Sequence, residues 1–201
     1  MKTSRRIGTG AVASIAALAV GIPAASAAQA APAAPAQATT ASVSASASVT
    51  VLGWPVLREG KNEQYPPATV RSLQYLLDAH GARLTVDGTF GPRTNGAVVA
   101  FQRAHKLPAD GVVRAATWKA LIITVKLGSR GYAVRAVQDQ ANFRNLKDGH
   151  SLNVDGIFGP RTRAWVVAFQ KVMRGMVPGF AVDGIVGPQT WAALVSEALA
   201  G

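Results

Sequence analysis

Apolar residues recur at helical spacing in three separate stretches of this chain. The recurring positions are Val70, Leu73 and Leu77, then Ala97, Val98 and Phe101, and near the C-terminus Trp191, Leu194, Val195 and Leu199. Residues three and four apart lie on one face of an α-helix, so each stretch predicts a helix with a single apolar stripe. We expect these stripes to face one another in an all-α fold.

The chain also contains an internal duplication. Four segments recur in the same order: 70–74 and 134–138, 87–94 and 155–162, 97–102 and 165–170, and 110–121 and 183–194. Each copy combines three helical stretches with two Asp-Gly loops, which predicts two tandem three-helix bundles: repeat one at 53–124 and repeat two at 125–201. Units of about 70 residues without disulfides are marginal alone, and only Ile122 to Lys126 separates the copies, so we expect them to pack together.

The first 52 residues predict export rather than a fold. Residues 1–27 place three cations before an apolar run and end in Ala-Ser-Ala, the pattern of a secretory signal peptide. The run is interrupted by glycine and is shorter than the ~20 residues that span a bilayer, which argues against a membrane anchor. Residues 28–52 are almost wholly Ala, Pro, Ser, Thr, Gln and Val without charge, and they predict a disordered linker. Sec and twin-arginine export both remain open.

The amino-acid composition excludes several classes of functional site. The chain has no cysteine, which excludes disulfide scaffolds, cysteine zinc sites and cysteine nucleophiles. The three histidines share no metal-ligand spacing, and no common catalytic motif is present, so we expect no metal, no cofactor and no catalytic residue. With 21 Lys and Arg against 10 Asp and Glu, the net charge of +11 favours an anionic partner.

The Asp-Gly loops have a local cause. An aspartate can accept hydrogen bonds from backbone N–H groups ahead of it, the next glycine accepts a positive φ, and Gly-Pro then starts a helix. The predicted structural loop residues are Asp87, Gly88, Gly91, Asp155, Gly156, Gly159, Asp183, Gly184 and Gly187. The alternative, that these aspartates form a catalytic pair, is less favoured because they recur once per loop, as scaffold residues do.

The ordered motifs resemble the bacterial peptidoglycan-binding domain of the three-helix type, which is found appended to cell-wall hydrolases. Repeat two carries the pattern nearly whole, in Leu127 to Gly131, Val134 to Gln138, Asp155 to Thr162, Val166 to Gln170 and Asp183 to Trp191. The resemblance covers residues 54–199. It implies a non-catalytic module that holds peptidoglycan in a shallow groove near the D-G-x-F-G-P-R-T loop. Repeat one departs from it by lacking Gly-Pro in its second loop, and repeat two by Trp165, where the family usually has alanine.

Candidate ligand-binding residues lie in and around these loops. They are Arg93, Thr94, Gln102 and Tyr75 in repeat one, and Arg161, Thr162, Gln170, Tyr132 and Trp165 in repeat two. An arginine near a helix N-terminus opposes the macrodipole, so its presence twice suggests capture of a peptide carboxylate, with a solvated cation as the alternative. The glutamines either contact ligand or bond the loop backbone, and Trp165 either stacks on sugar or packs between helices.

We therefore expect a secreted, extracellular or cell-wall-associated monomer that binds peptidoglycan, with anionic wall polymers as a further partner. Nucleic acid is not expected because the chain is exported and its cations are dispersed. No membrane contact is expected after signal cleavage. Two alternatives stay open: a cell-wall hydrolase that uses the loop carboxylates, and a regulatory partner of a secreted wall hydrolase.

Overall fold

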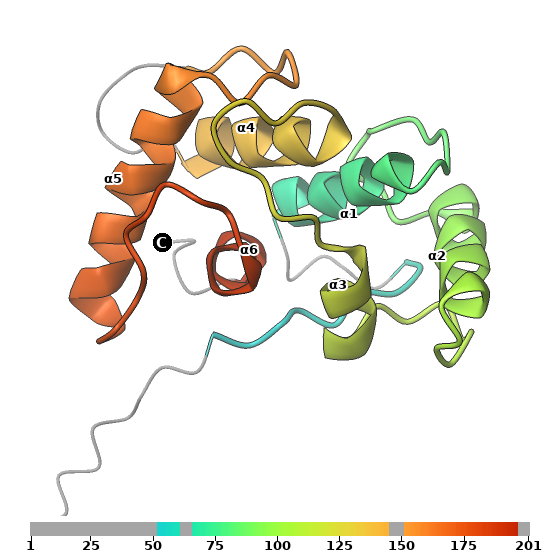
Figure 1. Ribbon diagram of the computed structural model, residues 1–201. Helices are drawn as coiled ribbons and strands as arrows, with labels where there is room; N and C mark the ends of the chain where they lie inside the picture. The colour runs from blue at the N-terminus through green and yellow to red at the C-terminus, as the bar shows by residue number, and fades with distance from the viewer. Residues whose placement is uncertain (1–51, 61–65, 145–150, 197–201) are drawn as a thin grey trace, which may run out of the picture. The chain divides into compact units, whose positions relative to one another are not determined.

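The computed structural model describes residues 52–60, 66–144 and 151–196. These residues form six helices and no strand, so the described part of the chain is all-α, as predicted (Figure 1). The helices are α1 Pro67–Ala79, α2 Pro92–Ala104, α3 Ala115–Leu121, α4 Tyr132–Arg144, α5 Pro160–Met176 and α6 Pro188–Val195. The predicted signal peptide, the linker up to residue 51, and Leu199 lie outside the described residues.

Proline starts four of the six helices. Pro67, Pro92, Pro160 and Pro188 each occupy a first helical position. A backbone N–H at this position has no partner within the helix, so proline loses nothing there and supplies a suitable φ. The helix α3 has no such proline and begins instead after Arg114, whose backbone is extended. The missing Gly-Pro in repeat one therefore does not abolish the helix.

A buried tryptophan in each repeat bonds to the segment that precedes the first helix of that repeat. Trp118 donates from Nε1 to the carbonyl oxygen of Pro55 over 2.8 Å, and Trp191 donates to that of Ile123 over 2.9 Å. Both indoles are fully buried. An isolated bridge beside each tryptophan joins the same two parts of the repeat: Leu57 with Val113, and Val125 with Val186. The segment after α3 is thus already held by repeat two and is not a free linker.

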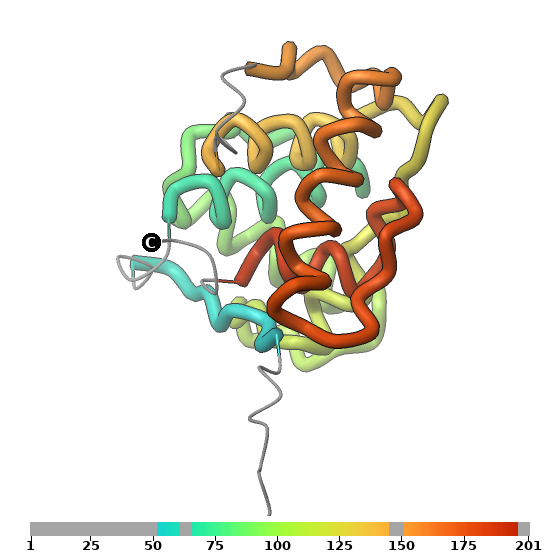
Figure 2. Tube along the Cα trace, turned by 90° about the vertical axis from the view of Figure 1, so that its left-hand side faces the viewer, coloured from blue at the N-terminus to red at the C-terminus, as the bar shows by residue number. Residues whose placement is uncertain are grey.

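The two repeats pack through their first helices, α1 and α4, which lie side by side in both views (Figures 1 and 2). The buried Gln140 of α4 donates to the carbonyl oxygen of Ala68 over 3.1 Å and to Ser72 Oγ over 2.9 Å. Beside it, Arg71 of α1 forms an ion pair with Asp139 of α4 at 2.8 Å. The expectation that the copies pack together is met by this contact, which we call the seam.

The insertion in repeat two lengthens a helix. The helix α5 has 17 residues, against 13 in the equivalent α2, and it continues to Met176 before the chain turns. Phe180 then packs fully buried in the core. The additional residues therefore extend α5 at the end away from the D-G-I-F-G-P-R-T loop, which keeps the same geometry as in repeat one.

Candidate functional site

A buried glutamine locks the first Asp-Gly loop of repeat one. Gln74 Nε2 donates to Asp87 Oδ1 over 2.8 Å, to the carbonyl oxygen of Thr89 over 3.1 Å and to Thr94 Oγ1 over 3.3 Å. Its Oε1 accepts from the Gly88 N–H over 2.9 Å. Because a buried amide without partners would cost stability, this set of bonds holds helix α1 and the loop in one relative position.

The same lock recurs in the other three loops. The locking residues are Gln138 for the loop at 155–162, Gln102 for the loop at 110–117 and Gln170 for the loop at 183–190. Each glutamine is at most 2% exposed. In the loop at 110–117 the aspartate differs, because Asp110 pairs with Arg114 at 2.6 Å.

These contacts bear on four predicted ligand residues. Gln102, Gln170, Thr94 and Thr162 are buried; the first three bond loop atoms, and Thr162 accepts from the locking Gln138. Their placement favours the loop-bonding alternative over direct contact with a ligand. No role was predicted from the sequence for Gln74 and Gln138. The recurrence of both glutamines in the repeated segments 70–74 and 134–138 is the feature that could have indicated it.

Hydrogen bonds to two loop aspartates, Asp87 and Asp155, favour their carboxylate forms. Asp87 accepts from Gln74 and from the Thr89 N–H, and these bonds lower its pKa below the ordinary value. The Ile157 N–H and then Gln138 lower the pKa of Asp155 in the same way. A general acid needs a raised pKa, so these groups are suited to loop formation rather than to proton donation.

The predicted loop glycines divide into two kinds. Gly88, Gly156 and Gly184 have φ values of +77°, +76° and +73°, and a Cβ on any of them would crowd a neighbouring side chain or carbonyl. Gly91, Gly159 and Gly187 are extended, with no other atom within 4 Å of a Cβ. Arg114 stands at the corresponding place before α3. Only the first glycine of each loop is therefore required by the backbone.

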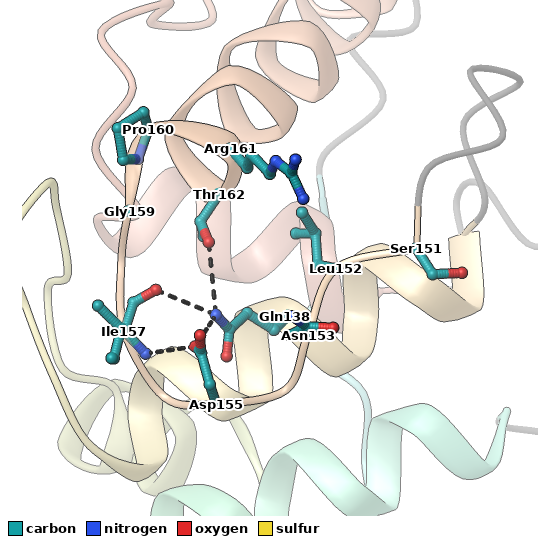
Figure 3. Close-up of a pocket in the computed structure, with 10 residues that line it drawn as sticks. All are labelled: Gln138, Ser151, Leu152, Asn153, Asp155, Ile157, Gly159, Pro160, Arg161 and Thr162. Carbon is teal, nitrogen blue, oxygen red and sulfur yellow. Dashed lines mark hydrogen bonds between the residues drawn. The ribbon is translucent and has the colours of Figure 1, made fainter.

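A hollow of about 400 Å³ lies beside the first loop of repeat two (Figure 3). Gln138, Leu152, Asp155, Ile157, Arg161 and Thr162 are among its lining residues, and we call it the repeat-two hollow. Arg161 is exposed in the first turn of α5 and extends toward Leu152. The hollow is thus lined by one cation and by exposed polar groups, next to a loop that hydrogen bonds from Gln138 hold in place.

A second hollow, of about 610 Å³, lies in repeat one between α2 and the end of α1. His80, Arg83, Leu84, Arg93, Ala97 and Phe101 are among its lining residues, and we call it the repeat-one hollow. Arg93 corresponds to Arg161 across the duplication, and Leu84 corresponds to Leu152. Each predicted ligand arginine therefore lines a hollow, although in repeat one Arg93 is the only lining residue that belongs to the loop at 87–94.

The predicted aromatic contacts lie elsewhere, since none of them lines either hollow. Tyr75 is partly buried near the seam, where burial and the Asp139 carboxylate raise its pKa. Tyr132 is 48% exposed at the first position of α4. Trp165 stacks on Phe169 of the same helix with a centroid distance of 5.3 Å.

Within the described residues, no group of three or more His, Cys, Asp or Glu side chains could hold a metal ion. His80 and His105 stand at the C-caps of α1 and α2. Among the same residues, no helix combines the length and the apolar character needed to cross a membrane.

The fold and the loops define a tandem pair of small helical binding domains. The family model described as "Putative peptidoglycan binding domain" matches residues 67–121 and 130–194, which is more than half of the chain. The chain therefore belongs to this family and carries the domain twice, and peptidoglycan of the cell wall is the partner that the family implies.

Three enzymes are among the similar curated proteins. A zinc D-Ala-D-Ala carboxypeptidase of Streptomyces albus G is 42% identical over 89 residues, which cover 40% of this chain and 33% of the relative. The N-acetylmuramoyl-L-alanine amidase CwlL of Bacillus licheniformis is 29% identical over 71% of this chain and 39% of its own length. A probable amidase of the same organism is 28% identical over 79% of this chain and 48% of its own length. The chain thus spans less than half of each relative, and no solved structure matches it.

Proposed function

We propose that this chain is a secreted, non-catalytic protein that binds cell-wall peptidoglycan through both repeats. The observation that carries the proposal is the position of Arg93 and Arg161. These equivalent, exposed cations each line a hollow, and each belongs to a loop that a buried glutamine holds in place. A rigid loop preserves the position of the cation when no ligand is bound, so less entropy is lost on binding.

Each hollow is open and small, and its affinity is modest. A millimolar site contributes only about −4 kcal/mol, whereas two sites on one polymer can raise the avidity by roughly 10² to 10⁴ without new contacts. The seam supports this mode because Gln140 and the ion pair of Arg71 with Asp139 hold the two repeats together. A repeated binding protein is suited to a ligand that is itself repeated.

The positive charge of the chain supports binding to an anionic cell wall. The chain carries a net charge of +11, and the cations on both repeats attract peptide carboxylates and anionic wall polymers. This long-range part is screened at an ionic strength near 0.15 M, where the Debye length is about 8 Å. Binding to walls should therefore weaken with salt without vanishing.

The proposal is tested by sedimentation with purified peptidoglycan walls. We expect the chain to leave the supernatant at low salt, and the double variant Arg93→Ala with Arg161→Ala to remain in it. Arg103→Ala with Lys171→Ala is the matched control, since it removes equal charge from equivalent exposed positions on α2 and α5 that line neither hollow. If both double variants lose wall binding equally, the binding depends on net charge alone. If the wild type does not sediment with the walls, the proposal is refuted.

The hydrolase alternative makes a different prediction. If the loop carboxylates were catalytic, incubation would clear a suspension of walls, and Asp155→Asn would abolish the clearing. The lowered pKa of Asp155 supports the non-catalytic proposal, because the group lacks the proton that a general acid donates. We expect the turbidity of the walls to stay constant.

A further inference from the structure

The repeat-one hollow differs in chemistry from the repeat-two hollow. Its lining contains four basic side chains, His80, Arg83, Arg93 and His105, and no carboxylate, amide or hydroxyl side chain. The repeat-two hollow is lined instead by residues such as Asp155, together with amide and hydroxyl groups. Arg83 and Arg93 offer only donors and a positive charge, so their part of the repeat-one hollow is suited to an anion.

The remaining walls of the repeat-one hollow are small and apolar. On the α2 side, Ala97, Ala100 and Ala104 present methyl groups beside the ring of Phe101. On the other side, Leu77 and Leu84 complete the apolar lining. Such walls give room and apolar contact to methyl-sized groups next to the cations.

Backbone geometry and hydrogen bonds hold the basic groups at this rim. Arg83 has a φ of +60°, in the left-handed region that a non-glycine residue rarely adopts. His80 Nε2 lies 3.0 Å from the Leu121 carbonyl oxygen, and His105 Nδ1 lies 2.9 Å from that of Phe101. A carbonyl only accepts, so each of these ring nitrogens donates, which anchors the two imidazoles at the rim.

The equivalent helix positions in repeat two carry large side chains. Trp165 stands where repeat one has Ala97, and its ring stacks on Phe169 with an interplanar angle of 10°. Arg144 stands where repeat one has His80, and its guanidinium lies 5.7 Å from the centre of the Phe169 ring. Arg144 also donates to the Leu194 carbonyl oxygen over 2.7 Å, which engages it with the end of α6. The space beside Ala97 is thus occupied by an indole in repeat two.

We propose that the repeat-one hollow binds the carboxylate end of a short peptide with small aliphatic side chains, and that Trp165 prevents repeat two from binding the same group at the equivalent place. Arg83 and Arg93 hold the terminal carboxylate, and the alanine walls contact the methyl groups. This inference rests on the proposed function and deepens it by giving the two repeats different ligand groups on the same polymer.

The test is an NMR titration of the full ¹⁵N-labelled chain with N-acetyl-alanyl-alanine. We expect amide signals at 80–84 and 97–105 to shift with millimolar affinity, and the peptide with an amidated C-terminus to bind about tenfold more weakly, since it lacks the charge that the arginines recognise. Equal binding of the two peptides, or shifts confined to repeat two, would overturn the inference.

Variants locate the site. Ala97→Trp introduces the residue that repeat two already carries, and Arg93→Gln removes one cation without adding bulk. Each should weaken peptide binding by at least about tenfold, while Arg103→Gln on the same helix leaves it unchanged. Trp165→Ala should leave binding in repeat one unchanged and add peptide-induced shifts in repeat two. If Ala97→Trp fails to fold, as its melting curve would reveal, Arg93→Gln and the amidated peptide still decide the matter.

The outcomes separate this inference from the proposed function. If the wild type sediments with walls but ignores the free carboxylate peptide, the inference fails and the wall-binding proposal stands. If the peptide binds the repeat-one hollow but walls do not retain the chain, the proposed function fails instead.

Discussion

At the scale of single residues, the loops depend on one glutamine and one glycine each. Gln138 accepts from the Gly156 N–H over 2.9 Å while donating to Asp155 over 2.8 Å, and it is buried beneath the hollow. A Cβ on Gly156 would meet the Gly131 carbonyl oxygen and the Arg135 side chain, and the φ of Gly156 is positive. Both features favour glycine, and this explains why the Asp-Gly pair, rather than the aspartate alone, recurs.

The two glycines of the loop at 155–162 should therefore respond differently to alanine. In Gly156→Ala, the new Cβ would lie 3.1 Å from the Gly131 carbonyl oxygen and 3.1 Å from Arg135 Nε, with φ at +76°. The left-handed conformation alone costs roughly 1 to 2 kcal/mol, and crowding adds to it. Gly159→Ala meets open space in an extended backbone and should change the free energy of unfolding by less than about 0.5 kcal/mol. Urea denaturation of both variants checks this, and equal losses would contradict it.

At the scale of elements, the apolar stripes predicted the helices well. The stripe of Val70, Leu73 and Leu77 is buried in α1, and that of Val98 and Phe101 is buried in α2. Such stripes are readable because helical periodicity is a local property of the sequence. The helix α5 extends to Met176 through the insertion, which the comparison of the two copies located without giving its conformation.

The candidate site was less readable from the sequence. The position of Arg93 and Arg161 beside the loops followed from the repeated motif, but the hollows depend on which side chains meet across two helices. Whether Ala97 of α2 leaves a space is decided by how α2 packs against residues 77–84. The burial of Gln102 against its loop is likewise a tertiary contact. The sequence motif alone could not decide whether this glutamine contacts a ligand or bonds the loop.

The loops also make stability depend on pH. The pKa values of Asp87 and Asp155 are lowered in the folded chain by hydrogen bonds to their carboxylates. Their contribution to stability is therefore complete above the ordinary pKa of 3.8, and it is lost as the pH falls from there through the lowered folded values. Thermal unfolding followed between about pH 2 and 6 should show this loss, and it should be smaller in Asp87→Asn with Asp155→Asn. Arg103→Gln, which alters no loop carboxylate, should keep the slope of the wild type, and an unchanged slope in the double aspartate variant would refute the assignment.

At the scale of the whole described unit, the seam makes two weakly stable repeats into one structure. Buried residues of both repeats form a single hydrophobic cluster, and α1 packs against α4 through the buried amide of Gln140. The equivalent positions of the two copies differ at this contact, since Gln140 of α4 corresponds to Leu76 of α1, and Ser72 of α1 corresponds to Ala136 of α4. The two first helices have thus diverged where they meet, as the inner faces of one folded unit do, although their loops have stayed alike.

The seam predicts that both repeats unfold together. In urea, amide signals from α2 in repeat one and from α5 in repeat two should disappear at the same concentration, as a two-state transition requires. Gln140→Ala leaves Ser72 and the Ala68 carbonyl without their buried donor, at a cost of about 1 to 3 kcal/mol, and it should separate the two midpoints or lower the slope of the transition. Asp139→Asn removes the negative charge of the partly buried ion pair with Arg71 but keeps a side-chain oxygen that can accept the hydrogen bond, and it should leave a single transition. Two separate transitions in the wild type would mean that the repeats fold independently, and the two hollows would then lose the fixed relation on which their avidity depends.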